Sequence, residues 1–298
     1  MALRSRPLLW LLTGALMVAW SIAPEPAPAS NQTRAAASQP PPRQPARPQA
    51  SPSAEPAPSA EPTPIGPPVW VVGAQPLSRR RDGYGAVRAT PPALVDRRLP
   101  TVDGLAPPTS GGFESTISPV PPPVLARSTW RPACPVPADQ LRYLTMSFHG
   151  FDGRVHTGEM LVNAKVAQDV VGIFEQLFAA GFPIEEMRVT AAPELDLPPT
   201  GDGNNTNAFV CRTIVNQGNW SAHAYGLAID LNPFHNPYIL GDLVVPELAS
   251  SYLERNRVRP GMVLAGSPAV KAFEAAGWTW GGRWSAPVDF MHFSATGH

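Results

Sequence analysis

The sequence predicts an α+β fold, a small antiparallel sheet with flanking helices, preceded by a disordered Pro/Ala-rich region. Two observations support this prediction. Of the 39 prolines, 26 precede Thr129, so a compact core is expected mainly after that residue. Beyond it, short strand-like runs and two helical patterns follow one another without the regular alternation of strand and helix that a parallel sheet requires.

The first 29 residues have the features of a targeting segment. Arg4 and Arg6 precede an apolar run over residues 7–23, and Ala27-Pro-Ala29 has the small-x-small form of a cleavage site. The run is long for a signal peptide and short for a secure membrane span, which needs ~20 apolar residues. We expect either a cleaved signal peptide or an N-terminal membrane anchor at 1–29, and both place the rest of the chain outside the cytoplasm.

Residues 30–104 are expected to form a Pro-rich disordered linker. Proline, alanine, serine and glutamine dominate its first part, and few aliphatic side chains are present to offset the entropy of ordering. Residues 105–128 carry isolated apolar side chains between prolines, which pack as extended segments more readily than as helices. We therefore expect an extended strap at 105–128, with continued linker as the alternative, and a folded domain at 129–298.

The folded domain is expected to begin with a hairpin. Leu144, Met146 and Phe148 alternate with polar neighbours, turn residues follow at 150–153, and a second strand covers 156–162.

Two helices and several short strands are expected after this hairpin. Asn163 is the predicted cap of a helix that ends at Gly181. Ser267-Pro268 is the predicted start of a second helix, which ends at Gly277. Further strand candidates lie at 187–191, 227–231, 278–280 and 288–293.

Two short blocks carry residues suited to a metal site. His223 and Asp230 are seven residues apart, too far for adjacent turns of one helix but suited to a loop that enters the apolar strand 227–231. A carboxylate in such a strand needs a partner, because burying an isolated charge is costly. His292 supplies a second imidazole, and three such ligands leave the fourth position of a hydrolytic zinc open for water.

Asp289 lies three residues before His292 and is the candidate general base for that water. Any one of these four residues alone more often has a structural role, for example in a cap or a turn. Their occurrence together in one chain favours a metallohydrolase.

The pattern Ser-x-His-x-x-Gly-x-Ala-x-Asp at 221–230, followed by Asp-x-x-His-Phe at 289–293, resembles a zinc metallopeptidase family. This family comprises D-alanyl-D-alanine carboxypeptidases and L-alanyl-D-glutamate endopeptidases, and it shares its fold with the amino-terminal domain of hedgehog. The resemblance covers residues 129 to 298, and we expect the endopeptidase-like branch. It implies that His223, Asp230 and His292 bind zinc, that Asp289 is the base, and that the substrates are peptidoglycan peptides of a bacterium.

The same resemblance implies further contacts with the substrate. The family has an upstream arginine that holds the substrate or its oxyanion, and Arg212 lies where that arginine is expected; a surface ion pair is the alternative. Ser221 is a candidate substrate ligand or, equally, a residue that orients the loop. Trp284 is a candidate cleft wall or a packing residue, whereas Trp278 and Trp280 are expected to pack.

The four other histidines are expected to be solvated or packing residues. His156 and His235 are the better candidates for a group that protonates the leaving amine or neutralises the oxyanion. The remaining two are His149 and His298.

Cysteine content and charge constrain the compartment and the partners. Cys134 and Cys211 are the only cysteines, and an even number in an exported chain favours a disulfide over two buried thiols or metal ligands. The 23 basic and 23 acidic residues give a formal net charge of zero, which provides no argument for a nucleic-acid partner. A membrane contact is expected only through the N-terminal segment.

The leading functional hypothesis is a zinc-dependent peptidase that cuts peptidoglycan stem peptides, as a carboxypeptidase or an endopeptidase. A wall-binding module that keeps the zinc fold without turnover and a zinc amidase are the alternatives. Zinc is inferred from the type of ligand, and nickel or copper would also bind two imidazoles and one carboxylate.

Overall fold

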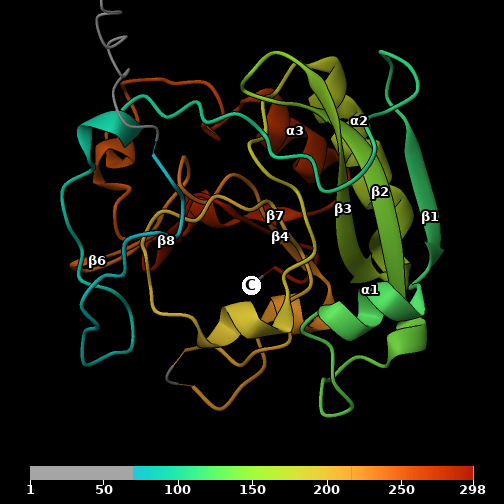
Figure 1. The fold of residues 1–298 in the computed structure, drawn as a ribbon, viewed down its shortest axis with the longest axis horizontal. Helices are drawn as coiled ribbons and strands as arrows, with labels where there is room; N and C mark the ends of the chain where they lie inside the picture. The colour runs from blue at the N-terminus through green and yellow to red at the C-terminus, as the bar shows by residue number, and fades with distance from the viewer. Residues whose placement is uncertain (1–69, 216, 298) are drawn as a thin grey trace, which may run out of the picture. The chain divides into compact units, whose positions relative to one another are not determined.

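The computed structural model describes residues 70–215 and 217–297 (Figure 1). The predicted targeting segment, the first part of the predicted linker and His298 lie outside this range. Within the described residues, no helix combines the length and the apolar character that a membrane crossing requires.

The first of three antiparallel sheets contains the predicted hairpin. Strands β2 (Leu141–His149) and β3 (Val155–Asn163) pair along their whole length, with Leu144 opposite Met160. Strand β1 (Ser115–Pro119), from the predicted strap, adds to the free edge of β2, so that the sheet order is β1-β2-β3.

Both predicted helices are present. The side chain of Asn163 accepts a hydrogen bond from the Lys165 amide at a 3₁₀ turn, η3 (Ala164–Val166), which leads into α2 (Ala167–Ala179). The Ser267 side chain caps α3 (Pro268–Ala275) by accepting from the Val270 amide. The remaining short helices are α1 (Pro122–Arg127), η1 (Pro92–Leu94), η2 (Ala138–Gln140), η4 (Ala192–Asp196), η5 (Ala222–Tyr225), η6 (Ser250–Leu253) and η7 (Gly281–Arg283).

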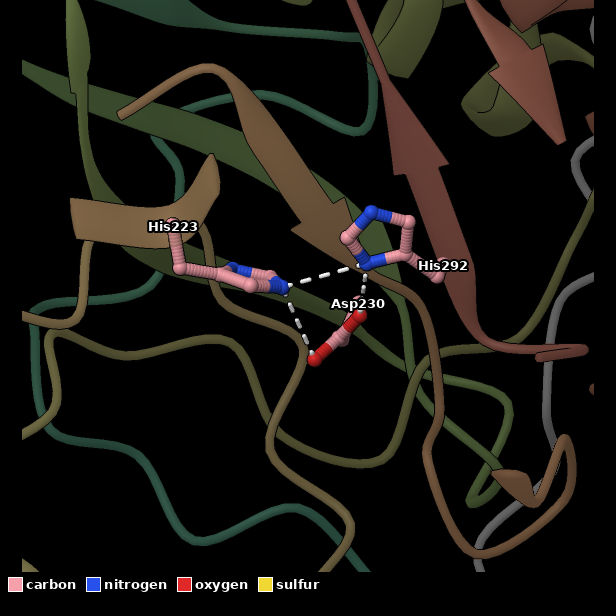
Figure 2. Close-up of side chains that lie close together, drawn as sticks. All are labelled: His223, Asp230 and His292. Carbon is pink, nitrogen blue, oxygen red and sulfur yellow. Dashed lines mark hydrogen bonds and ion pairs between the residues drawn. The ribbon is translucent and has the colours of Figure 1, made fainter. Parts of the chain in front are cut away.

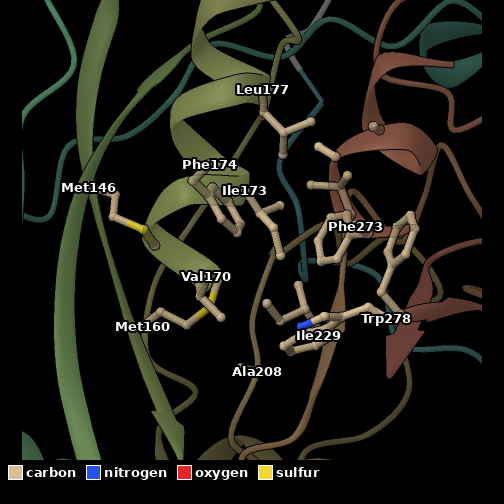
Figure 3. Packing of buried hydrophobic residues seen from close by; sticks show 14 of the residues in the cluster. Met146, Met160, Val170, Ile173, Phe174, Leu177, Ala208, Ile229, Phe273 and Trp278 are labelled. Atoms are coloured by element: carbon tan, nitrogen blue, oxygen red, sulfur yellow. The ribbon is translucent and has the colours of Figure 1, made fainter. Parts of the chain in front are cut away.

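The main core lies where α2 and α3 pack against the strands (Figure 3). Phe273 of α3 stacks on Phe293 with ring centroids 3.8 Å apart. Full burial of such a side chain contributes about 1.5–3 kcal/mol. Trp278 and Trp280 are only 3% and 4% exposed, which confirms their predicted packing role.

The other two sheets are small. The second has the order β4-β9-β7 and the third has the order β6-β5-β8. Their strands are β4 (Ala228–Asp230), β5 (Tyr238–Leu240), β6 (Leu243–Val245), β7 (Thr279–Trp280), β8 (Val288–Asp289) and β9 (His292–Ser294).

Two strand predictions differ from the structure. Residues 187–191 form no strand, although the Glu159 amide donates to the Met187 carbonyl. The single strand expected at 288–293 is instead two strands, β8 and β9, which belong to different sheets. The chain therefore changes sheet between Asp289 and His292.

Residues 70–104, which composition assigned to the linker, are packed on the folded part. Leu94 is fully buried beside Phe234 and Tyr252. Arg97 is 2% exposed, and its guanidinium donates to both carboxylate oxygens of Glu185, at 2.6 and 2.8 Å. Only a few buried side chains, among them Leu94 and Arg97, hold the segment in place. The average composition of the segment therefore does not reveal its packing.

The buried ion pair between Arg97 and Glu185 gives a stability prediction. Arg97→Met leaves the Glu185 carboxylate buried without its counter-charge, so we expect a loss of about 3–5 kcal/mol in the free energy of unfolding. The control Arg257→Met removes an exposed partner of Asp96 and should cost at most about 1 kcal/mol. Urea unfolding measures both, and equal losses would contradict a structural role for the buried pair.

A second prediction concerns pH. Burial lowers the pKa of His235 to about 3. The folded state therefore excludes a proton that the unfolded chain binds below about pH 6.5, so stability is complete above that pH and declines below it at about 1.4 kcal/mol per pH unit. Between pH 7 and pH 5, His235→Gln should lose about 2 kcal/mol less unfolding free energy than the wild type. Parallel pH profiles of the two proteins would contradict this.

Candidate metal centre and active site

The pairing of β4 with β9 places Asp230 directly opposite His292. The Leu231 amide donates to the Met291 carbonyl, and hydrogen-bonded pairs alternate along antiparallel strands, so Asp230 and His292 form a non-hydrogen-bonded pair. Side chains of such pairs are the closest on a sheet. On its other side, the Asp230 backbone exchanges two hydrogen bonds with Asn207, which fixes the strand that carries the carboxylate.

His223 reaches the same point from a short helical turn. Ser221 caps η5, and its hydroxyl accepts a hydrogen bond from the His223 amide. Gly226 ends the turn with φ +66°, and a Cβ atom there would lie 2.6 Å from the Asn163 amide nitrogen. Glycine is therefore required both by the backbone conformation and by the close contact with β3.

Three side chains converge at this point (Figure 2). His223 Nε2 lies 3.2 Å from His292 Nδ1 and 3.2 Å from Asp230 Oδ2, and His292 Nδ1 lies 3.1 Å from Asp230 Oδ1. Ligand atoms about 2.0–2.1 Å from a tetrahedral zinc lie about 3.3 Å from each other. The three side chains therefore have the spacing of a group that could hold a metal ion.

The protonation of His223 is set by its second ring nitrogen. Nδ1 lies 2.7 Å from the carbonyl oxygen of Ala208, which can only accept, so Nδ1 carries the proton. Nε2 consequently faces Asp230 and His292 and is the nitrogen through which the neutral imidazole would bind a metal ion. Such an outer hydrogen bond orients a metal-binding imidazole and raises its basicity.

The electrostatics favour an ionised Asp230. Burial alone would raise the pKa of Asp230, but the charges and hydrogen bonds of His223 and His292 outweigh burial and hold that pKa well below its usual range. A carboxylate that remains ionised in this position is suited to bind a cation.

Asp289 lies in the opposite electrostatic situation. Burial raises the pKa of Asp289 to about 7, and the negative charge of Asp230 adds to the rise. Its Oδ1 is buried without a hydrogen-bond partner among the described residues. A buried carboxyl oxygen without a partner, beside three converging ligand atoms, fits a site whose remaining partners are a metal ion and its water.

The segment before the site is braced by the predicted disulfide. Cys134 and Cys211 are bonded, with their Cα atoms 5.8 Å apart. Arg212 follows immediately; its side chain is exposed, and its carbonyl accepts from the Ser221 amide. The disulfide therefore ties the start of the Arg212–Ser221 loop to the region before β2.

Trp284 is the aromatic residue beside the ligands. Its ring centroid lies 5.5 Å from that of His292, and the side chain is partly buried. Ser221 makes the loop-orienting contact described above. Roles in substrate binding for Trp284 and Ser221 remain predictions.

The other described histidines are held elsewhere. His149 stacks on Phe178, with ring centroids 4.2 Å apart. His156 lies between the carboxylates of Asp103 and Asp152, and His235 is hydrogen bonded to Asn204 and to the Arg97 carbonyl. None of these contacts joins them to the three ligand residues.

Two tyrosines near the candidate base are absent from the sequence prediction. Tyr238 lies directly opposite Asp289 in the pairing of β5 with β8, and Tyr84 interacts electrostatically with Asp289 and Arg212. No local motif marks either tyrosine, because both positions depend on pairing between segments distant in the sequence.

Comparison with protein families gives one match, to the family described as D-alanyl-D-alanine carboxypeptidase, over residues 215–295. This segment is less than a third of the chain and contains His223, Asp230, Asp289 and His292, but not Arg212. Neither the curated proteins nor the solved structures gave a match. The chain is thus similar to a peptidase family over the segment that carries the converging residues. The match supports a peptidase function related to peptidoglycan, and the endopeptidase-like branch stays a prediction.

Metal binding by the three ligands is directly testable. We expect the purified protein to bind one zinc ion, and Asp230→Asn or His292→Ala to weaken binding by at least tenfold, because each removes a ligand. The control His149→Asn, distant from the cluster, should bind as the wild type does. Calorimetric titration measures affinity, and zinc at 100 times its dissociation constant should add about 2.7 kcal/mol to the wild-type unfolding free energy. Equal affinities in all four proteins would contradict the assignment.

Proposed function

We propose that the protein is a zinc-dependent peptidase that hydrolyses peptidoglycan stem peptides. The observation that carries this proposal is the convergence of His223, Asp230 and His292 beside the unpartnered carboxyl oxygen of Asp289. A purely structural metal site does not require a further carboxyl group with a perturbed pKa.

Zinc held by the three residues would polarise the peptide carbonyl and lower the pKa of water to about 7. Asp289 acts as the general base in this proposal. Burial raises the pKa of Asp289, which favours a carboxyl group that can both take up and return a proton. Asp289 then carries the proton that the leaving amine needs.

Arg212 is proposed to hold the substrate carboxylate or the oxyanion. A guanidinium donates two parallel hydrogen bonds to such a group, and the exposed Arg212 side chain is free of a carboxylate partner among the contacts described for it. The disulfide at Cys211 supports this role by limiting the movement of the adjacent backbone. Trp284, which packs against His292, is proposed as a wall of the substrate cleft.

The cellular compartment of the protein is part of the same proposal. A disulfide and a cell-wall peptidase match suggest an extracytoplasmic protein. We propose export through residues 1–29, either as a cleaved signal or as a retained anchor. We also propose that the folded domain at 129–298 is completed by the strap at 105–128 and by the packed segment 70–104.

A wall-binding module on the same fold and a zinc amidase are the competing functions. A binding module needs the three ligands but has no use for a general base at position 289. An amidase would use the same chemistry on a different bond, so the identity of the product distinguishes it from a peptidase.

The Asp289→Asn variant tests the proposed mechanism. The amide cannot accept the proton, so hydrolysis of purified peptidoglycan should fall by about 10²–10⁴-fold, while bound zinc stays at the wild-type level. Asp169→Asn, an exposed carboxylate on α2, is the matched control and should retain full activity. Mass spectrometry of the products identifies the bond, from released D-alanine, a new peptide amino terminus, or a peptide separated from the sugar. Zinc-loaded wild type without any hydrolysis would favour the binding module.

A further inference from the structure

A turn of the N-terminal segment forms part of the surroundings of the candidate active site. Residues 79–85, here called the 79–85 turn, are closed by a bridge between Arg79 and Gly85 and by a hydrogen bond of 2.7 Å from the Arg80 amide to the Tyr84 carbonyl. The 79–85 turn lies outside the segment that matches the carboxypeptidase family.

The 79–85 turn is fastened at two points, to the tip of the β5–β6 hairpin and to Glu247, which follows β6. At one end, the Arg80 guanidinium pairs with Asp242 at the hairpin tip, at 3.1 Å. At the other end, the Gly85 amide donates to the Glu247 side chain, and the Arg88 amide donates to the Glu247 carbonyl. In the sequence, Tyr84 lies between these two attachments, so its backbone belongs to a turn that is fastened at both ends.

The same hairpin brings Tyr238 to the candidate base. Tyr238 of β5 is directly opposite Asp289 of β8. The Phe290 amide donates to the Pro237 carbonyl, so the alternation of hydrogen bonds makes Tyr238 and Asp289 a non-hydrogen-bonded pair with closely spaced side chains. Both tyrosines are partly exposed.

Electrostatic coupling agrees with this arrangement. Burial raises the pKa of Tyr84, Arg212 opposes the rise, and Asp82, Glu247 and Asp289 add to it. Burial likewise raises the pKa of Tyr238, with Tyr84 and Asp289 adding to it. Both phenols are therefore protonated at neutral pH and available as hydrogen-bond donors, and Tyr84 is near enough to Arg212 to interact with its charge.

We propose that Tyr84 and Tyr238 contact the substrate and, together with Arg212, form a subsite for a carboxylate of the stem peptide. Two hydroxyl donors and a guanidinium match the acceptor oxygens of a carboxylate, and none of the three needs to lose a proton to bind it. This inference rests on the proposed peptidase function. Tyr84, a residue of the N-terminal segment, thereby contributes to the choice of substrate.

The terminal carboxylate of the peptide and the carboxylate of an internal D-glutamate are the two sources of this group. Three synthetic stem peptides distinguish them: one with both carboxylates free, one amidated at the terminus, and one amidated at the D-glutamate. Tyr84→Phe and Tyr238→Phe remove single hydroxyl groups. Tyr143→Phe is the matched control, because its hydroxyl is hydrogen bonded to Glu159 within the β2–β3 hairpin.

We expect Tyr84→Phe and Tyr238→Phe each to lower kcat/KM for the free peptide about tenfold, chiefly by raising KM, which corresponds to about 1.4 kcal/mol. The peptide that lacks the recognised carboxylate should be a poor substrate for the wild type and should lose nothing further in either variant. Tyr143→Phe should show wild-type preference, and zinc content should be equal in all proteins.

Binding of the same peptides to the zinc-loaded Asp289→Asn protein provides a readout that does not need turnover. Equal losses on all three peptides, or no loss on any, would overturn the subsite. Selective binding that Tyr84→Phe abolishes, in a protein whose wild type cleaves no peptide, would retain the subsite and refute the peptidase.

Discussion

The pairing of β4 with β9 is the constraint on which the candidate active site depends. It sets an acidic and an imidazole side chain face to face across two strands, at the type of position where side chains approach most closely. The candidate site is consequently built on the sheet, and the short helix η5 needs to supply only one further candidate ligand, His223. Rigid elements hold ligand geometry more accurately than loops do, and here the adjoining Asn207 segment and the Ala208 carbonyl restrain both sides of that geometry.

The change of sheet between Asp289 and His292 separates two roles that lie three residues apart. His292 belongs to the sheet that carries Asp230, whereas Asp289 belongs to the sheet that carries Tyr238. The two carboxyl groups accordingly differ in their surroundings: Asp230 lies against both imidazoles, whereas burial and the charge of Asp230 dominate at Asp289. Opposite shifts of two neighbouring pKa values are the arrangement expected where one carboxylate binds a cation and the other transfers a proton.

Much of the fold and of the site could be predicted because the signals are local. Side-chain caps at Asn163 and Ser267 marked both helices, and alternation marked the β2–β3 hairpin. Residue type and motif singled out His223, Asp230 and His292, whose side chains converge in the structure. The packing of residues 70–104 was not, because it depends on a buried ion pair across 88 positions of sequence. The division of 288–293 was missed for a similar reason: Phe290 is apolar, and the alternation of the segment does not record which partner each half pairs with.

The disulfide at Cys134 and Cys211 is a local brace, whereas the anchoring of residues 70–104 extends the functional unit well beyond the segment that resembles known peptidases. In the proposed peptidase, the N-terminal segment contributes Tyr84 to the substrate subsite, so loss of this segment would alter selectivity. Proteolytic removal of residues 1–85 would spare His223, Asp230, Asp289 and His292 while removing Tyr84, and removal of residues 1–97 would also remove Arg97. In the proposed peptidase, the length of the N-terminal segment would therefore influence which stem peptides are accepted.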